Sequence, residues 1–171
     1  MLVEGRTWLF GDDISTDLLY PQVAYALPLA EAAKQVFSAN RPGWSDEVKT
    51  GDIVVGGRNF GTGSSRPAVA LLKQLGVGAC LAESFTNLYM RNCVNFAMPG
   101  LPAPGILDIV EEGDVVRANL RTGLIENTRT GATLEAAPLP PELLEIIEAG
   151  GVMASLVSRG LVPAATEGAS R

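Results

Sequence analysis

A glycine-rich stretch between an apolar run and an apolar-periodic segment constrains this chain most. The run Asp52–Val55 leads into Gly56-Gly57-Arg58-Asn59-Phe60-Gly61-Thr62-Gly63-Ser64-Ser65-Arg66, and helical periodicity follows from Pro67. Glycine has no Cβ and tolerates unusual dihedral angles, so such a loop lets the backbone approach a ligand closely. The order predicts a strand, a tight loop and a helix, with functional groups held where the helix begins.

The end of this loop carries two hydroxyls and a guanidinium, from Ser64, Ser65 and Arg66. A helix N-terminus has unpaired N–H groups and a positive dipole end, which favour an anion. The planar fork of arginine can donate two parallel hydrogen bonds to a carboxylate. With Pro67 expected at the first helical position, Ser65 or Arg66 would cap the helix. The stretch predicts a carboxylate-binding corner of an active site.

The loop has two other interpretations. It matches neither the GxxxxGK[ST] nor the GxGxxG phosphate-binding pattern, and no lysine is placed to reach a β- or γ-phosphate. A purely structural turn is the stronger alternative, because glycine, asparagine and serine are common in ordinary loops.

A second polar segment, Gly11 to Pro21, follows a short strand expected over residues 6–10. Within it, Asp12–Asp17 holds three carboxylates, a serine and a threonine. These carboxylates could bind a cation, but the EF-hand pattern and its bidentate glutamate are absent. Serine and aspartate could equally cap turns, so both interpretations stay open.

Composition excludes several classes of protein. The chain has 171 residues, a net charge of −6 and no run of lysine and arginine, which argues against a nucleic-acid partner. No apolar stretch reaches a membrane-spanning length, and the N-terminus lacks the order of a secretory signal. We expect a cytoplasmic protein with a single domain over residues 1–162 and a frayed tail over residues 163–171.

The chemistry available to the chain is limited. It has no histidine, which is the commonest general base and metal ligand, and its two cysteines are Cys80 and Cys93. Both cysteines lie in apolar surroundings and are expected to be small buried thiols. An iron–sulfur cluster usually needs three or four thiolates, so we expect no metal site in this chain alone.

The periodicity predicts the remaining elements. Helices are expected over residues 29–38, 84–95 and 140–149, and strands over residues 51–57 and 77–83. The two strands flank the helix after the glycine loop and suggest a parallel β–α–β unit. Residues 44–50 look like a polar connection, and Gly123 is expected to turn a hairpin in the last third of the chain.

Together the two polar segments resemble the small subunit, or swivel domain, of the aconitase superfamily. Gly11–Pro21 is similar to that family's G-D-N-I-D-T-D-x-I-x-P opening, and Gly51–Arg66 to its strand and G-x-N-F-G-x-G-S-S-R loop. Ser84-Phe85, Asn92 and Pro99 are similar to a further family stretch. The small subunit of 3-isopropylmalate dehydratase is the closest likeness.

The resemblance implies an α/β fold, a three-layer β/β/α swivelling domain of the aconitase small-subunit type. It also implies a large-subunit partner that carries a [4Fe-4S] cluster, and a small dicarboxylic acid as substrate. Ser64 matches the family's catalytic base. The substrate-binding positions implied are Ser65, Arg66, Thr16, Asp17, Asn59, Gly61 and Gly63.

The chain departs from the family after the loop, where the family usually has Glu-His-Ala and this chain has Pro67-Ala68. Residues 22–27 match no substrate-selecting motif. The resemblance implies a hydro-lyase that isomerises 3-isopropylmalate to 2-isopropylmalate in leucine biosynthesis. A related dehydratase, acting on a methylated malate or on homoaconitate, and a non-catalytic dicarboxylate-binding module are the alternatives.

Overall fold

The computed structural model describes residues 1–63 and 66–164. Within them seven strands form one sheet in the order β4-β3-β2-β1-β5-β6-β7. The strands are β1 (Leu2–Leu9), β2 (Ile53–Gly56), β3 (Ala79–Ala82), β4 (Gly100–Pro102), β5 (Val115–Asn119), β6 (Leu124–Asn127) and β7 (Thr133–Glu135). β1 to β4 are parallel and β5 to β7 antiparallel. β1 joins the two halves, because it pairs with β5 along its first part and with β2 along its last part.

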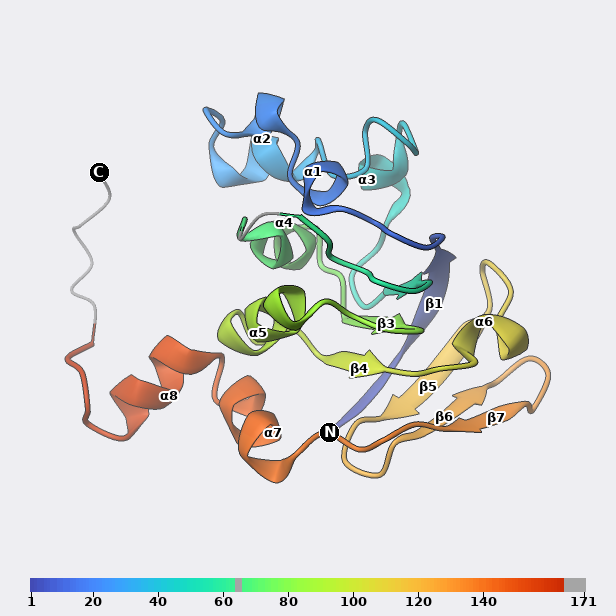
Figure 1. Cartoon of the computed structure of the whole chain (residues 1–171). Coiled ribbons are helices and arrows are strands. Elements are labelled where there is room, and N and C mark those ends of the chain that lie inside the picture. The colour runs from blue at the N-terminus through green and yellow to red at the C-terminus, as the bar shows by residue number, and fades with distance from the viewer. Residues whose placement is uncertain (64–65, 165–171) are drawn as a thin grey trace.

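Short helices pack around this sheet, as Figure 1 shows. They are α1 (Thr16–Leu19), the 3-10 helix η1 (Gln22–Ala24), α2 (Leu29–Ala33), α3 (Trp44–Glu47), α4 (Ala68–Gln74), α5 (Asn87–Asn95), α6 (Ile106–Ile109), α7 (Pro141–Glu148) and α8 (Val152–Ser158). None of the helices in the described part of the chain is long and apolar enough to cross a membrane.

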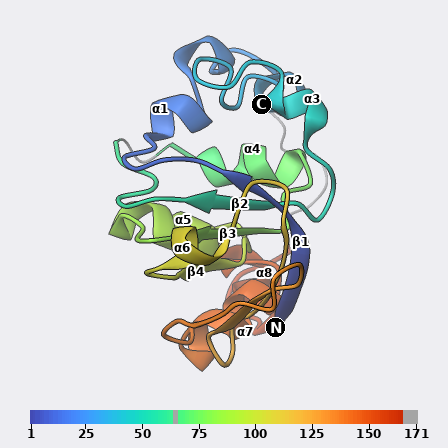
Figure 2. The same ribbon diagram turned by 90° about the vertical axis from the view of Figure 1, so that its right-hand side faces the viewer.

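Two apolar cores divide the molecule into three layers. Side chains alternate along a strand, so each parallel strand contributes to both faces of the sheet. Val54 and Cys80 belong to the core shared with α1 to α5, whereas Ile53 and Leu81 belong to a second core. That second core also contains Val116 and other buried residues of β5 and β6. The parallel strands therefore lie between helices and the curled antiparallel half of the sheet, an arrangement that Figure 2 shows from the side.

This architecture confirms the predicted β/β/α fold class. The expected β–α–β unit is β2, α4 and β3, whose strands pair in parallel from Ile53–Ala79 to Gly56–Ala82. The expected hairpin is β5 and β6, turned at Gly123. Gly123 has a φ of +81°, and a Cβ there would overlap the carbonyl of Ala136, so this turn requires glycine.

Several predicted boundaries were wrong. The first strand begins at Leu2, because its N-terminal half pairs with β5, which lies far away in the sequence. The helix expected over residues 29–38 ends at Ala33, and the one expected over residues 84–95 begins at Asn87. There the Thr86 hydroxyl caps the helix by accepting a hydrogen bond from the Tyr89 N–H.

The segment expected to be a polar connection over residues 44–50 includes α3 instead. Trp44 at its start is 1% exposed, because aromatic rings from other segments enclose it. Its ring meets those of Trp8, Phe10 and Phe37 edge to face, with centroids 5.0–6.1 Å apart. This aromatic cluster holds Phe37 and Trp44 against Trp8 and Phe10 at the end of β1.

Candidate active site

The glycine loop docks directly against the Gly11–Pro21 segment. The N–H groups of Gly61 and Thr62 both donate to the carbonyl of Ile14, at 2.7 and 3.1 Å. The Thr16 N–H in turn donates to the Thr62 carbonyl at 2.6 Å. The two polar segments therefore form one structural unit, and an isolated parallel β-bridge joins Ser15 to Thr62.

The start of the loop uses its polar groups to hold this unit together. The Arg58 N–H donates to Asp12 at 2.7 Å, and its guanidinium binds the same carboxylate at 2.8 Å. These bonds lower the pKa of Asp12, the backbone bond most of all. The Asn59 side-chain amide donates to Asp13 at 3.0 Å. Asp12 and Asp13 thus bind residues of the loop. These bonds favour a structural role for the two carboxylates over the binding of a cation.

The middle of the loop is shaped by close approaches that require glycine. Gly61 has a φ of +84°, and a Cβ there would overlap the Tyr89 side chain. Its carbonyl accepts a hydrogen bond from the Thr86 hydroxyl at 2.7 Å. Gly63 has a φ of +105°, and a Cβ there would lie 2.9 Å from the Thr16 hydroxyl oxygen. Gly63 therefore brings the loop into contact with the first residue of α1 just before Ser64.

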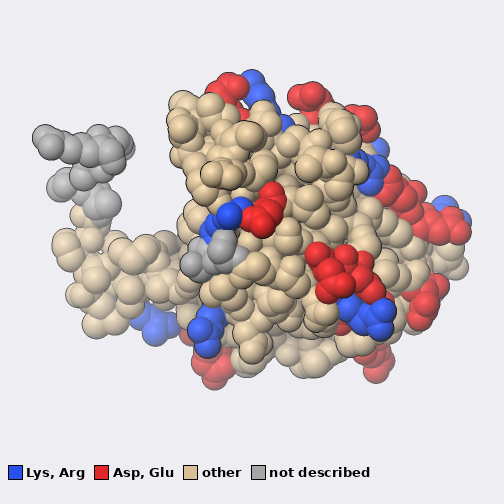
Figure 3. All heavy atoms as spheres, turned by 45° about the horizontal axis from the view of Figure 1, so that its top comes forward, with Lys and Arg blue, Asp and Glu red and all other residues tan. Residues whose placement is uncertain are grey.

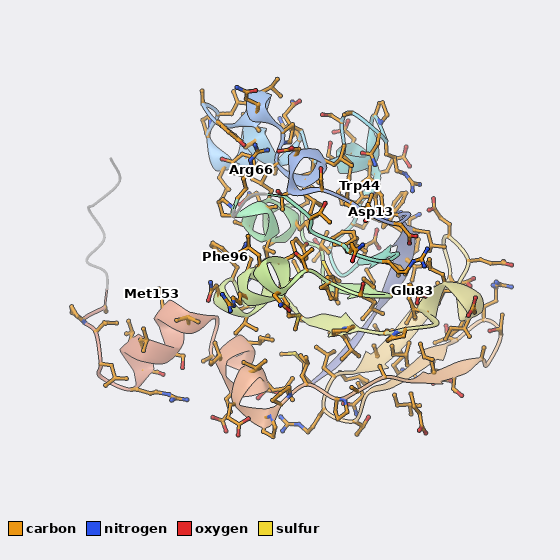
Figure 4. The ribbon with its side chains drawn as sticks, viewed as in Figure 1. Asp13, Trp44, Arg66, Glu83, Phe96 and Met153 are labelled. Atoms are coloured by element: carbon orange, nitrogen blue, oxygen red, sulfur yellow. The ribbon has the colours of Figure 1, made fainter. Side chains whose placement is uncertain are left out.

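At the end of the loop, the Arg66 side chain contacts the Gly11–Pro21 segment. Its Nη1 forms an ion pair with the Asp17 carboxylate and donates to the Tyr20 carbonyl at 3.2 Å. The Arg66 side chain is 26% exposed, so the guanidinium is held partly out of water. Figure 4 shows Arg66, just before α4, well away from Asp13, which follows β1.

The predicted site residues thus fall into two groups. The structure brings Thr16, Asp17, Gly63 and Arg66 together at the entrance to α4, whereas Asn59 lies with Asp13 at the other end of the loop. Ser64 and Ser65, the predicted base and its neighbour, lie outside the described residues. The group around Arg66 provides a cation beside hydroxyl and carboxylate groups, an arrangement that can bind a carboxylic acid.

Known proteins are similar in sequence over nearly the whole length of the chain. A protein named 3-isopropylmalate dehydratase small subunit 1, from Methanopyrus kandleri, is 39% identical over 98% of this chain and 98% of its own. A 3-isopropylmalate dehydratase small subunit from Aquifex aeolicus is 40% identical over 90% of this chain and 94% of its own. The chain belongs to the 3-isopropylmalate dehydratase small-subunit family.

Two further comparisons agree with this membership. The Aconitase C-terminal domain model matches residues 21–103. A crystal structure of a 3-isopropylmalate dehydratase from Methanocaldococcus jannaschii superposes with a TM-score of 0.87 and 32% identity, over 94% of this chain and 96% of that one. The fold and the family predicted from the sequence are therefore confirmed, and with them the class of dehydratase and isomerase subunits.

The chain differs from the expectation at the start of α4. Pro67 lies at the N-cap position and α4 begins at Ala68, so Arg66 is not the N-cap of this helix and Pro67 is not its first residue. The Ala68 N–H donates to the Arg66 carbonyl at 2.8 Å, which turns the chain sharply between the loop and the helix. The Pro67-Ala68 departure from the family motif thus lies directly beside Arg66.

Two residues near Arg66 were not identified as site residues from the sequence. The Tyr25 ring lies under the guanidinium, 4.8 Å from ring centroid to Arg66 Cζ, and the Asn92 amide donates to the Arg66 carbonyl at 3.4 Å. Asn92 matches the asparagine of the family stretch after Ser84-Phe85, but that resemblance alone gave it no role at the site. Tyr25 had no such signal, because residues 22–27 match no motif of the family.

The residues that the structure describes do not fit an iron–sulfur cluster. No group of three or more histidine, cysteine, aspartate or glutamate side chains in residues 1–63 and 66–164 could hold a metal ion. Both thiols are buried, and burial raises the pKa of Cys80 to about 12 and raises that of Cys93 as well. Because thiolates are the ligands of such clusters, these cysteines are structural.

Proposed function

We propose that this chain is the small subunit of a cytoplasmic two-subunit hydro-lyase that converts 3-isopropylmalate to 2-isopropylmalate, a step of leucine biosynthesis. The observation that carries the proposal is the placement of Arg66 beside Asp17, where two segments distant in the sequence meet. The names and the full-length coverage of the relatives support the choice of reaction.

Within this function, Arg66 binds a carboxylate of the substrate. Its guanidinium has five N–H donors, and a carboxylate accepts two of them side by side. We assign Ser65, Thr16 and Asp17 to the same binding site, with Asn59, Gly61 and Gly63 as the loop positions that shape it. The hydrogen bonds of the loop support this assignment, because they fix the backbone on both sides of the substrate-facing residues.

Ser64 is the proposed base that removes a proton from the carbon beside a substrate carboxylate. It follows Gly63 and precedes Arg66 by two residues, and consecutive Cα atoms lie about 3.8 Å apart. A serine alkoxide is costly where its charge is unpaired. The Arg66 guanidinium and nearby backbone N–H groups would stabilise that charge in the manner of an oxyanion hole.

The partner of this chain is a large subunit that we propose to hold a [4Fe-4S] cluster. That cluster would act as a Lewis acid on the substrate hydroxyl. The unsuitable thiols of the small subunit support placing it on the partner. Figure 3 shows acidic side chains mostly over the top and right of the view and an uncharged area toward its left. Interface centres are depleted in charged residues, so this area suits a protein partner.

Two alternatives differ in substrate or in activity. One relative, from Methanocaldococcus jannaschii, is named an isopropylmalate/citramalate isomerase small subunit, and another, from Methanothermobacter thermautotrophicus, a methanogen homoaconitase small subunit. A related dehydratase is therefore the second candidate. A non-catalytic dicarboxylate-binding module, suggested by Pro67-Ala68, is the third.

Reconstitution with the large subunit of the same organism separates these functions. The isolated chain should be colourless and inactive, and the complex should convert 3-isopropylmalate through an unsaturated diacid that is followed by its ultraviolet absorbance. Citramalate and homoaconitate are assayed in parallel. Faster turnover of either would favour the second candidate. Binding of dicarboxylates without elimination, in a complex with an intact cluster, would favour the third.

A further inference from the structure

We propose that Tyr25 is a positioning residue, whose ring holds the Arg66 guanidinium in the orientation that receives a substrate carboxylate. This inference rests on the proposed function. The Arg66 Cζ lies 4.8 Å from the centroid of the Tyr25 ring. A cation over an aromatic face is attracted by the negative charge of the ring face. The ring therefore restrains the guanidinium in a direction that no hydrogen bond controls.

The hydrogen bonds of Arg66 show which edge the ring leaves open. Nη1 is already used by the Asp17 carboxylate and the Tyr20 carbonyl. Among the described residues, Nε and Nη2 of Arg66 have no hydrogen-bond partner. Hydrogen bonds hold Nη1, and the Tyr25 ring covers one face of the guanidinium. The edge formed by Nε and Nη2 therefore remains for a substrate carboxylate. That edge carries two parallel N–H groups, the side-on arrangement that matches a carboxylate.

Tyr25 is itself held by a neighbouring residue. The Tyr20 ring meets the Tyr25 ring edge to face, with centroids 5.1 Å apart and planes at 80°. Tyr20 also supplies the carbonyl that accepts from Arg66 at 3.2 Å. The two tyrosines therefore form one support on either side of η1. It restrains the guanidinium without taking up the edge that a substrate needs.

The contact is not required for the fold. Tyr25 is 46% exposed and belongs to neither apolar core. Replacing a half-exposed ring leaves both apolar cores intact, so the free energy of unfolding should fall by less than it does for a core residue. A surface cation–π contact that served folding alone would leave substrate binding unchanged. The Michaelis constant therefore distinguishes positioning of Arg66 from a structural contact.

The test uses the complex assembled with the large subunit and 3-isopropylmalate as substrate. Tyr25→Ala should raise KM about two- to fivefold, the factor expected for an exposed cation–π contact, with a smaller effect on kcat. Tyr25→Phe keeps the ring and should restore the wild-type KM. Val23→Ala, at a position that is 68% exposed in the same segment, is the matched control. An unchanged KM in Tyr25→Ala, or an equal loss in Tyr25→Phe, would overturn the inference.

A second measurement does not depend on activity. In the isolated labelled subunit, the Tyr25 ring should shift the NMR resonances of the Arg66 side chain upfield. The shift should persist in Tyr25→Phe and disappear in Tyr25→Ala. Its absence from the wild type would refute the positioning. A complex that turned over none of the three candidate substrates would refute the proposed function instead, and the NMR shift would still decide the placement of Tyr25.

Discussion

Gly61 lies against the ring of Tyr89 so closely that residue 61 has no room for a side chain. Its φ of +84° also belongs to the region that other residues rarely adopt. The backbone of Gly61 is bound on both sides, by the Ile14 carbonyl and by the Thr86 hydroxyl. This close approach therefore helps to set the shape of the loop that leads to Arg66.

Gly61→Ala should therefore lower the free energy of unfolding by about 2–4 kcal/mol, from the strained φ and the overlap with Tyr89. Gly11→Ala is the control, because a Cβ at residue 11 would meet no atom within 4 Å. Urea unfolding of both variants measures the difference. Equal stability of the two variants would contradict the proposed packing of the loop.

Arg66→Lys should raise KM about tenfold or more, because lysine cannot offer two parallel N–H groups to a carboxylate. It should leave assembly with the large subunit intact. Arg117→Lys, in a surface ion pair with Glu4 on the antiparallel half of the sheet, is the control and should keep the wild-type KM. Steady-state kinetics of the three complexes provide the comparison. A wild-type KM in Arg66→Lys would show that the guanidinium does not bind substrate.

Asp114 should make the protein sensitive to acid. Its carboxylate is buried and receives hydrogen bonds from Arg129, the Glu111 N–H and the Asn127 amide. The bond from Arg129 does most to lower the pKa of Asp114, which lies well below its ordinary value. Because the pKa in the folded state is below that in the unfolded state, the stabilisation is complete above about pH 4 and is lost as the pH falls below it.

Asp114→Asn should therefore destabilise the protein by about 1–3 kcal/mol at pH 7 and by progressively less toward pH 2. The exposed Asp46→Asn is the control, and urea unfolding at a series of pH values gives the free energies. If the difference between Asp114→Asn and the wild type did not shrink in acid, the network around Asp114 would not contribute through its charge.

Much of the candidate site could be proposed from the sequence, because the residues that suggest it lie in two short segments. The glycine loop, the polar segment around Thr16 and Asp17 and the strand before each could be identified from short runs of residues. The resemblance to a known family implied that the glycine loop and the Thr16–Asp17 segment lie at one site. The ion pair between Arg66 and Asp17 is a contact that joins these two segments.

The remaining features depend on contacts between distant segments. Trp44 stands among polar neighbours, and its burial follows only from the rings of Trp8, Phe10 and Phe37. Leu2 to Gly5 form a strand because β5 pairs with them, and α8 was not predicted at all. The contact of Tyr25 with Arg66 is also one between residues that are distant in the sequence.

Turnover by the complex that carries Ser64→Ala tests the central claim most directly. The variant should assemble with the large subunit, keep the cluster content of the wild type and bind 3-isopropylmalate. Loss of a general base should lower kcat by about 10²- to 10⁴-fold. Normal turnover in an assembled, cluster-loaded Ser64→Ala complex would contradict the proposal that the loop of this subunit delivers the catalytic base.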